Sequence, residues 1–210
     1  MRSEQWFEDT YLDSIASFAP YIAAPLVESG VLDETDHIVL HSDGAAAIAQ
    51  ALVARNADAH ITIVALPSHA AWLNRELKTS IPDENARKRV SVAEQSMFES
   101  PPDCDAVLFV KSLSQLPDAD AVHVLQKTSN SLTSGDRLLV LEDVFDVDGL
   151  DEHAAEADVL NLALHGSGHR TDAELRALFE RAGLRLDEVQ TIGWGHSLYL
   201  LRTSEKGITC

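Results

Sequence analysis

The stretch VLHSDGAAAIAQAL, residues 39–52, has the layout of a strand, a tight turn and a helix that begins on small residues. The run HIVLH at 37–41 is typical of a buried strand, and AAAIAQALVARN at 45–56 is typical of a helix. Asp43 and Gly44 stand between them, and an Asp-Gly pair favours a tight turn. This strand–turn–helix unit is the pattern that the rest of the chain repeats.

Strands and helices alternate on both sides of this unit. Further strands are predicted at 60–67, 89–93, 105–110, within 133–144, at 184–193 and at 196–203. Helices are predicted over 4–29 with a break near Pro20, and at 68–78, 118–132, 151–164 and 172–182. The alternation predicts an α/β fold with a mostly parallel seven-stranded sheet, helices on both faces and a C-terminal antiparallel hairpin at one edge.

Three parts of the chain are distinguished: an N-terminal helical segment at 1–30, the α/β domain at 31–204 and a tail at 205–210. In open parallel sheets, ligands bind outside the carboxyl ends of the strands, near the switch in strand order. The topology therefore predicts a site built from residues 41–46, 65–69, 94–98, 111–116 and 142–146.

The composition of the chain argues against several classes of function. The 34 acidic and 16 basic residues give a formal net charge of −18, which repels phosphate backbones and argues against a nucleic-acid partner. The chain contains no apolar run long enough to span a bilayer, and its acidic N-terminus is unlike a signal peptide, so the cytoplasm is expected. Cys104 and Cys210 lie far apart, and the histidines lack ligand spacing, so neither a disulfide nor a metal site is predicted.

Three stretches carry a resemblance to a known family. They are DAVLFVKSLSQLPDADAVHVLQKTSNSLTSGDRLLVLEDV at 105–144, HGSGHRTDAELRALFERAGLRL at 165–186 and ALP at 65–67. Together they resemble the C-terminal catalytic domain of class I S-adenosylmethionine-dependent O-methyltransferases of small molecules, over residues 18–202. The resemblance implies a Rossmann-like methyltransferase fold. By this resemblance, the family's helical N-terminal dimerisation domain, which also covers the partner's substrate pocket, would be missing. Either the protein works without that lid or another polypeptide supplies it.

The resemblance places the family's cofactor-binding positions on substituted residues. The glycine-rich motif falls on VLHSDGAA at 39–46, which brings His41, Asp43 and Gly44 to the cofactor. Its ribose-binding acid falls on Ala65, and the acid beside the adenine falls on Ser96. Each lost charged acceptor would cost about 1.5–3 kcal/mol of binding free energy, so weakened binding of S-adenosylmethionine is expected.

Two neighbouring positions are open to more than one interpretation. Met97 either packs on the adenine or belongs to the core, and Lys111 matches a basic position of the family but suits a solvated strand end equally well.

The catalytic positions are also substituted. The family's general base, a histidine, falls on Ser114, and a serine alone does not take a proton from a phenol near neutral pH. The first of the two acids that flank that histidine is retained as Glu142, whereas the second falls on His169. A relocated Glu142–His169 dyad is therefore one hypothesis for catalysis, and His169 as an ordinary loop histidine is the other.

Three functions follow from the resemblance. The leading hypothesis is a non-catalytic homologue that acts as a structural or regulatory partner of another protein, either an active methyltransferase or a second copy of itself. The second is an active O-methyltransferase that uses S-adenosylmethionine through rebuilt contacts. The third is a protein that binds a different small molecule in the same cleft.

Overall fold

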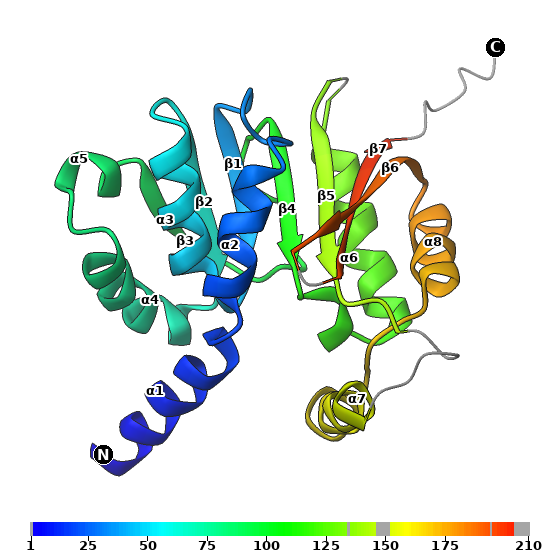
Figure 1. Cartoon of the computed structure of the whole chain (residues 1–210), viewed down its shortest axis with the longest axis horizontal. Coiled ribbons are helices and arrows are strands. Elements are labelled where there is room, and N and C mark those ends of the chain that lie inside the picture. Colours follow the sequence, from blue (N-terminus) through cyan, green and yellow to red (C-terminus); the bar gives the residue numbers. More distant parts are fainter. Residues whose placement is uncertain (1, 134, 146–151, 194, 204–210) are drawn as a thin grey trace.

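The computed structural model describes residues 2–133, 135–145, 152–193 and 195–203. A seven-stranded sheet with the order β3-β2-β1-β4-β5-β7-β6 forms its centre (Figure 1). The strands are β1 His37–His41, β2 His60–Ala65, β3 Val90–Glu94, β4 Ala106–Val110, β5 Arg137–Glu142, β6 Leu184–Ile192 and β7 His196–Thr203. Strands β1 to β5 pair in parallel, whereas β7 runs antiparallel to both β5 and β6. The predicted mostly parallel sheet with a C-terminal hairpin is confirmed.

Helices cover both faces of the sheet. They are α1 Arg2–Ala16, α2 Ala19–Glu28, α3 Ala45–Arg55, α4 Pro67–Ser80, α5 Glu84–Arg87, α6 Asp118–Ser131, α7 Glu152–His165 and α8 Asp172–Arg181, with a short 3-10 turn, η1, at Leu113–Gln115. One apolar core joins α2, α3 and α4 to the sheet, and a second joins α6 and α8 to its other face. The central strand β4, AVLFV, is buried along its whole length because both cores cover it.

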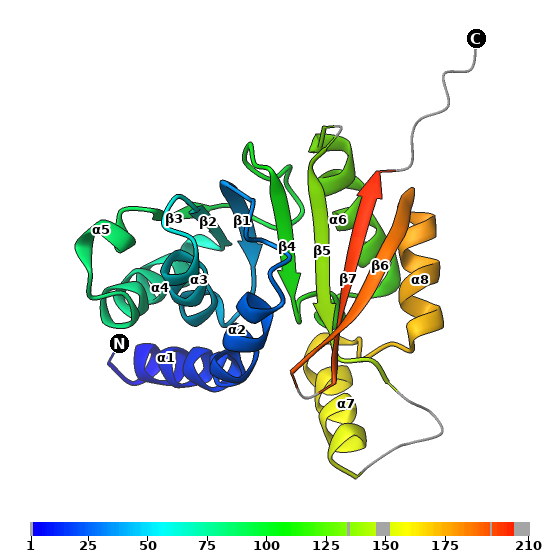
Figure 2. The ribbon, with the colours of Figure 1, turned by 45° about the horizontal axis from the view of Figure 1, so that its top comes forward.

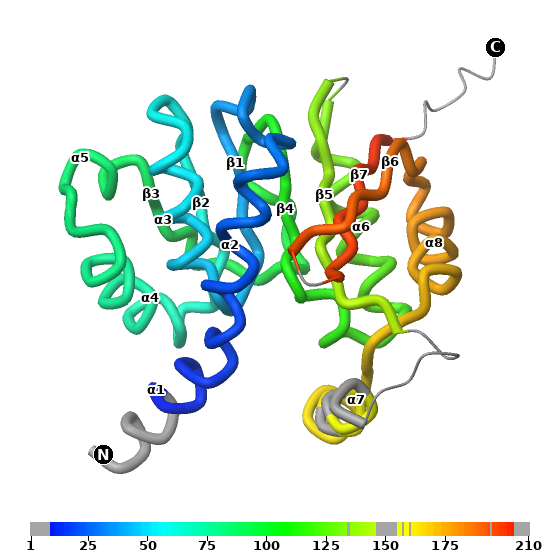
Figure 3. The backbone as a smooth tube through the Cα atoms, in the orientation of Figure 1, coloured from blue at the N-terminus to red at the C-terminus, as the bar shows by residue number. Residues whose placement is uncertain are grey.

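The path of the backbone explains where a site forms. It runs outward from β1 to β3, returns to β4 on the other side of β1 and ends beside β5 (Figure 3). The strand order therefore reverses between β1 and β4, which is where such sheets bind ligands. In Figures 1 and 2, α1 and α7 both lie at the end of the molecule towards which β4 and β5 point.

Some element boundaries differ from the prediction. Strand β2 ends at Ala65, two residues before the predicted limit, because Pro67 begins α4; proline lacks the N–H that a first helical turn leaves unpaired. The short helix α5 was not predicted, and the side chain of Asp83 caps it by accepting from the amides of Asn85 and Ala86. The N-terminal helices separate at residues 17–18, and Pro20 lies in the first turn of α2.

The capping box predicted at Thr171 is confirmed. Its side chain accepts from the backbone N–H of Glu174, and the Glu174 side chain accepts from the backbone N–H of Thr171. The predicted tail at 205–210 lies outside the described residues. No helix within the described residues is both long and apolar enough to cross a bilayer.

Candidate functional site: a cavity and a histidine cluster

A cavity of about 250 Å³ opens at the carboxyl ends of β1 and β2. Five of the residues that the resemblance assigns to the cofactor line it: His41, Asp43, Ala65, Ser96 and Met97. The volume is close to the lower end of the range for small-molecule sites, roughly 300–1,000 Å³. Ser112 and Gln115 also line the cavity, so the topology brings the first four predicted segments of the site together.

The polar side chains of the cavity differ in their charge state. Asp43 is half-buried, and its Oδ2 accepts from Nε2 of Gln115 at 2.5 Å. Burial raises the pKa of Asp43, while the Gln115 hydrogen bond and the nearby His69 and His165 oppose that rise. His41 stacks on Phe109, with ring centroids 4.5 Å apart, and burial lowers its pKa to about 4. His41 is therefore a neutral wall of the cavity near pH 7.

Gly44 does not line the cavity. It lies beneath the start of α2, where an added Cβ would overlap the Cβ of Ala19 and lie 3.4 Å from its Cα. Its φ of −91° is accessible to any residue, so the absence of a side chain is what matters here. Gly44 lets α2 pack on the turn between β1 and α3, which is a structural role.

Helix α1 supplies another wall of the cavity through Leu12, which is buried. Two polar contacts hold α1 against α4. Nε1 of Trp72 donates to Oδ1 of Asp13 at 3.0 Å, and Arg75 pairs with Asp9 at 2.8 Å. Trp72 itself lines the cavity, so α1 and α4 close this side of it together.

Lys111, another predicted site residue, also lies outside the cavity lining. Its backbone is in the left-handed region, with φ of 52°, which is uncommon for a residue with a side chain. Its Nζ lies 2.7 Å from Oδ2 of Asp143 and 5.0 Å from the centre of the Phe18 ring. The ammonium of Lys111 therefore belongs to a second group of polar side chains, which lies beside the cavity.

That second group, the histidine cluster, consists of Lys111, Asp143, Asp158, His169 and His196. His196 forms a short hydrogen bond to Oδ1 of Asp143 through Nδ1. Burial opposes ionisation of Asp143, but the His196 hydrogen bond and the Lys111 charge outweigh it and hold the pKa of Asp143 well below its usual range. Asp143 is therefore a permanent negative charge at the end of β5.

His169 lies between two carboxylates of this cluster. Its Nδ1 is 3.4 Å from Oδ1 of Asp158, and its Nε2 is 3.7 Å from Oδ2 of Asp143. Both distances are long for a strong hydrogen bond. The backbone of this loop is held by a shorter contact than the His169 ring, because the backbone N–H of His169 donates to Oδ1 of Asp158 at 2.7 Å. A Cβ added at Gly168 would overlap that same oxygen.

Glu142 and His169, the two residues of the proposed dyad, have different partners in the structure. Glu142 is buried and accepts from the backbone N–H of Leu113 at 2.7 Å, while no partner is described for its Oε2. Burial raises the pKa of Glu142 to about 7, against the opposing effect of the Leu113 hydrogen bond. The carboxylates beside His169 are instead Asp143 and Asp158.

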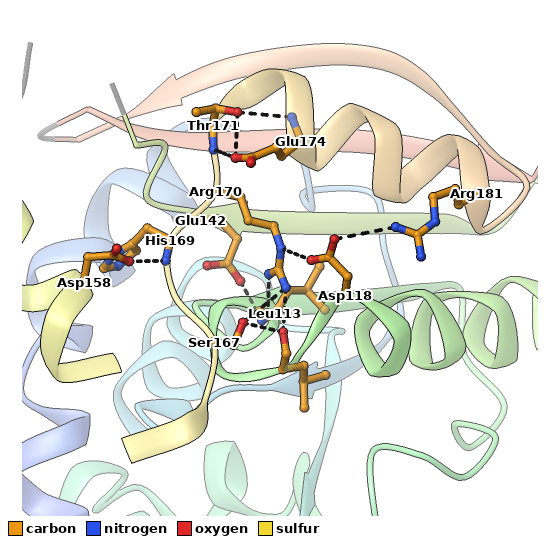
Figure 4. Close-up of polar contacts among 11 residues, drawn as sticks. Leu113, Asp118, Glu142, Asp158, Ser167, His169, Arg170, Thr171, Glu174 and Arg181 are labelled. Carbon is orange, nitrogen blue, oxygen red and sulfur yellow. Dashed lines mark hydrogen bonds and ion pairs between the residues drawn. The ribbon is translucent and has the colours of Figure 1, made fainter. Parts of the chain in front are cut away.

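Ser114 lies in η1, which a buried arginine holds in place (Figure 4). Arg170 donates to the carbonyls of Leu113 and Leu116, at 2.7 and 2.5 Å, and its Nε pairs with Asp118 at 3.0 Å. Its NH2 also lies 3.3 Å from the hydroxyl of Ser167. We call these contacts the Arg170 clamp; they fix η1 relative to the loop that carries His169.

The cavity fits an adenosyl cofactor in part. Met97 and Phe98 offer apolar and aromatic surface to a flat base. Asp43 is the one carboxylate among the described lining residues, and Ala65 and Ser96 offer no acid to a ribose or an adenine. Within the described part of the chain, no group of three or more His, Cys, Asp or Glu residues is placed to hold a metal ion.

The model of the O-methyltransferase domain family matches residues 2–185. The chain belongs to this family. The mitomycin biosynthesis 6-O-methyltransferase of Streptomyces lavendulae is 31% identical over 112 residues, which are 51% of this chain and 31% of that protein. Bovine (Bos taurus) acetylserotonin O-methyltransferase is 28% identical over 161 residues, 76% of this chain and 45% of that protein. The chain therefore spans less than half the length of these two relatives.

Solved structures agree with the family. The crystal structure of TnmH superposes with a TM-score of 0.85 and 20% identity, over 96% of this chain and 60% of that one. The O-methyltransferase NcsB1 from neocarzinostatin biosynthesis, in complex with S-adenosylmethionine and 2-hydroxy-5-methyl naphthoic acid, gives 0.82 and 20%, over 96% and 59%. At these identities the likeness shows the class I methyltransferase fold.

Several residues of this O-methyltransferase-family chain were not predicted as site residues. Asp143 and Asp158 flank His169, His196 holds Asp143, and Gln115 holds Asp43. Asp143 follows directly after Glu142 and fell inside the predicted range 142–146, so the topology indicated its place. The contact with His196 joins residues 53 apart in sequence and has no local signal.

Proposed function

We propose that this O-methyltransferase-family chain binds S-adenosylmethionine in the cavity and catalyses methyl transfer to a hydroxyl group of a small molecule. The observation that carries the proposal is the cavity itself, at the switch in strand order and lined by five of the predicted cofactor positions. Two further facts support it: the family match over residues 2–185, and a structural neighbour solved with S-adenosylmethionine and a naphthoic acid.

When bound, S-adenosylmethionine supplies an activated methyl group. The chain contributes position first, because methyl transfer gains much of its rate from proximity and orientation. Met97 and Phe98, which line the cavity, would hold the base. Gln115 links the cavity to the histidine cluster, since it donates both to Asp43 and, at 3.4 Å, to the carbonyl of Lys111.

His169 is the side chain of the cluster that we assign to proton removal from the accepting hydroxyl. A neutral imidazole takes a proton, and the charges of Asp143 and Asp158 stabilise the imidazolium that results. Ser114, which stands where the family has its histidine, lies buried in η1 and does not replace that base.

Calorimetric titration with S-adenosylmethionine and S-adenosylhomocysteine tests the binding step. The sharpest variant is Ala65→Asp, which restores a ribose acceptor at the end of β2. If the cofactor binds as proposed, affinity rises roughly ten-fold or more, as expected for a hydrogen bond to a charged group. The matched control is Ala57→Asp on an exposed turn, which adds the same charge and leaves affinity unchanged. An Ala65→Asp protein that binds no better than wild type contradicts the proposed site.

The transfer step is measured as S-adenosylhomocysteine released in the presence of a panel of phenols and hydroxy acids. His169→Gln is expected to lower the rate by about 10²–10⁴ with an active acceptor, the usual contribution of a general base. His60→Gln, on an exposed strand end, is the control. Equal rates for wild type and His169→Gln would remove His169 from the mechanism.

A non-catalytic homologue is the second candidate function. The observation in its favour is that the cavity places Ala65 and Ser96 where the family has acids, while Ser114 is buried. In that case the chain would act by pairing with a homologous methyltransferase or with a second copy of itself. Absence of heat with both ligands, together with a stable complex in light scattering, supports this candidate. Binding of a ligand without an adenosyl group would favour the third hypothesis.

A further inference from the structure

Asp43 has a role in the cavity that the family's pattern does not explain. It occupies a position where the family has glycine, and its side chain lines the cavity next to Ser42. Gln115 donates to one carboxylate oxygen, Oδ2, at 2.5 Å. Among the described residues, no donor is found for the other oxygen, Oδ1. The carboxylate is therefore held through Oδ2, and its Oδ1 is available to a ligand.

Two histidines, His69 in the cavity lining and His165, lie near enough to Asp43 to oppose the rise in its pKa. The described residues that line the cavity include neither lysine nor arginine. Lys111, which follows β4, pairs its ammonium with Asp143. His41 is neutral because it is buried, and Gln115 offers only a neutral amide. A partly buried carboxylate with no lysine or arginine among the described lining residues favours a ligand that brings a cation.

We propose that Asp43 binds the ammonium group of the cofactor's α-amino acid end, with Gln115 as the residue that orients the carboxylate. The proposal rests on the proposed function, because it names the part of an α-amino-acid-bearing nucleoside that this cavity recognises. An ammonium group donates hydrogen bonds, which a sulfonium group does not, so it matches a carboxylate oxygen that lacks a donor. The side-chain contact from Asp43 takes the place of the close approach between backbone and ligand that a glycine allows at this position.

Three ligands separate the ammonium from the rest of the cofactor. S-adenosylmethionine carries the ammonium and the sulfonium, S-adenosylhomocysteine carries the ammonium alone, and 5′-methylthioadenosine carries neither. Calorimetry with Asp43→Asn should show S-adenosylmethionine and S-adenosylhomocysteine binding roughly ten- to hundred-fold more weakly, with 5′-methylthioadenosine unchanged. Asparagine keeps the shape and can still accept from Gln115. Asp58→Asn, on an exposed turn, is the control for the loss of one negative charge.

A second variant tests the orienting role. Gln115→Met keeps the carboxylate and removes its donor, so it should weaken both amino-acid-bearing ligands by less than Asp43→Asn does and leave 5′-methylthioadenosine unaffected. Circular dichroism and thermal unfolding establish that each variant is folded before titration.

Four results would overturn the proposal. Equal losses for all three ligands mean that Asp43 shapes the cavity, and a loss confined to S-adenosylmethionine assigns Asp43 to the sulfonium. Unchanged binding of all three by folded Asp43→Asn refutes the contact while leaving cofactor binding intact. Absence of binding of any of the three to wild type refutes the proposed function, and this inference with it.

Discussion

Two polar regions lie at the carboxyl end of the sheet, and they differ in how far their hydrogen-bonding groups are paired within the protein. In the Arg170 clamp, a buried guanidinium donates to two main-chain carbonyls and pairs with Asp118, so its hydrogen-bonding capacity is used within the protein. In the cavity, Asp43 has a single described donor, through one of its two carboxylate oxygens. The clamp is complete without a ligand, whereas the cavity is not.

This difference explains where the family resemblance is strong. The blocks at 105–144 and 165–186 contain the clamp and the capping box at Thr171, and their residues are needed for the loops to fold. The stretch at 39–46 and the positions of Ala65 and Ser96 carry departures, and of these residues His41, Ser42, Asp43, Ala65 and Ser96 line the cavity. Substitution at the cavity changes ligand binding with little cost to the scaffold.

Removal of the clamp should have the largest effect on stability. Arg170→Met keeps the aliphatic volume but removes the charged donor of both carbonyls, which leaves Leu113 with the backbone N–H of Leu116 and Leu116 with the hydroxyl of Ser167. We expect the free energy of unfolding to fall by about 4 kcal/mol, from two lost charge-assisted hydrogen bonds. Urea denaturation followed by circular dichroism measures it. Arg176→Met, at an exposed helix pair, should cost under about 0.5 kcal/mol; similar losses at both sites would contradict the contrast.

Substitution of Gly44 tests whether the turn beside the cavity also contributes to the stability of the fold. Gly44→Ala should lower the free energy of unfolding by about 3 kcal/mol, because the new Cβ overlaps that of Ala19. Ala19→Gly removes the obstacle and leaves the Ala19 Cα at 3.4 Å. The double variant should therefore be more stable than Gly44→Ala alone, which a double-mutant cycle by urea denaturation measures. Additive losses would mean that the two residues do not press on each other.

Glu142 belongs to neither region fully, since it is buried like the clamp but has an oxygen without a described partner. Burial raises its pKa from 4.5 to about 7 in the folded state. The unfolded chain therefore loses the proton first, and the contribution of Glu142 to stability is present below pH 4.5 and lost as pH rises towards 7.

Glu142→Gln should remove the loss of stability that Glu142 causes as pH rises. Between pH 5 and pH 8, the free energy of unfolding of wild type should fall by about 2.5 kcal/mol more than that of Glu142→Gln. Glutamine still accepts from Leu113, so the hydrogen bond is matched in the two proteins. Urea denaturation at several pH values measures the difference, and parallel pH profiles would show that Glu142 titrates normally.

The sequence predicted the scaffold well because its signals are local. Apolar runs such as AVLFV, the Thr171–Glu174 capping pair and Pro67 as a helix start each depend on a few neighbouring residues. The place of the cavity was predicted in outline, since topology alone placed His41, Ala65 and Ser96 at one edge of the sheet. Their role in cofactor binding stays a prediction.

The remaining parts of the site depend on contacts between distant residues. Asp43 meets Gln115 across 72 positions, and Trp72 meets Asp13 across 59. The space that Gly44 leaves for Ala19 is likewise a property of packing, because its φ is unremarkable. Such contacts leave no periodic pattern in one sequence, so the partner of each group became visible only in the fold.

Helix α1 gives the cavity a wall that is not part of the sheet. Leu12 lines the cavity, and the contacts of Asp9 with Arg75 and of Asp13 with Trp72 attach that wall to α4. A ligand that touches Leu12 adds its own contacts to this attachment, so detachment of α1 and departure of the ligand become coupled steps. The rate at which a ligand leaves would then depend on the strength of two polar contacts between α1 and α4 as well as on the groups that bind the ligand.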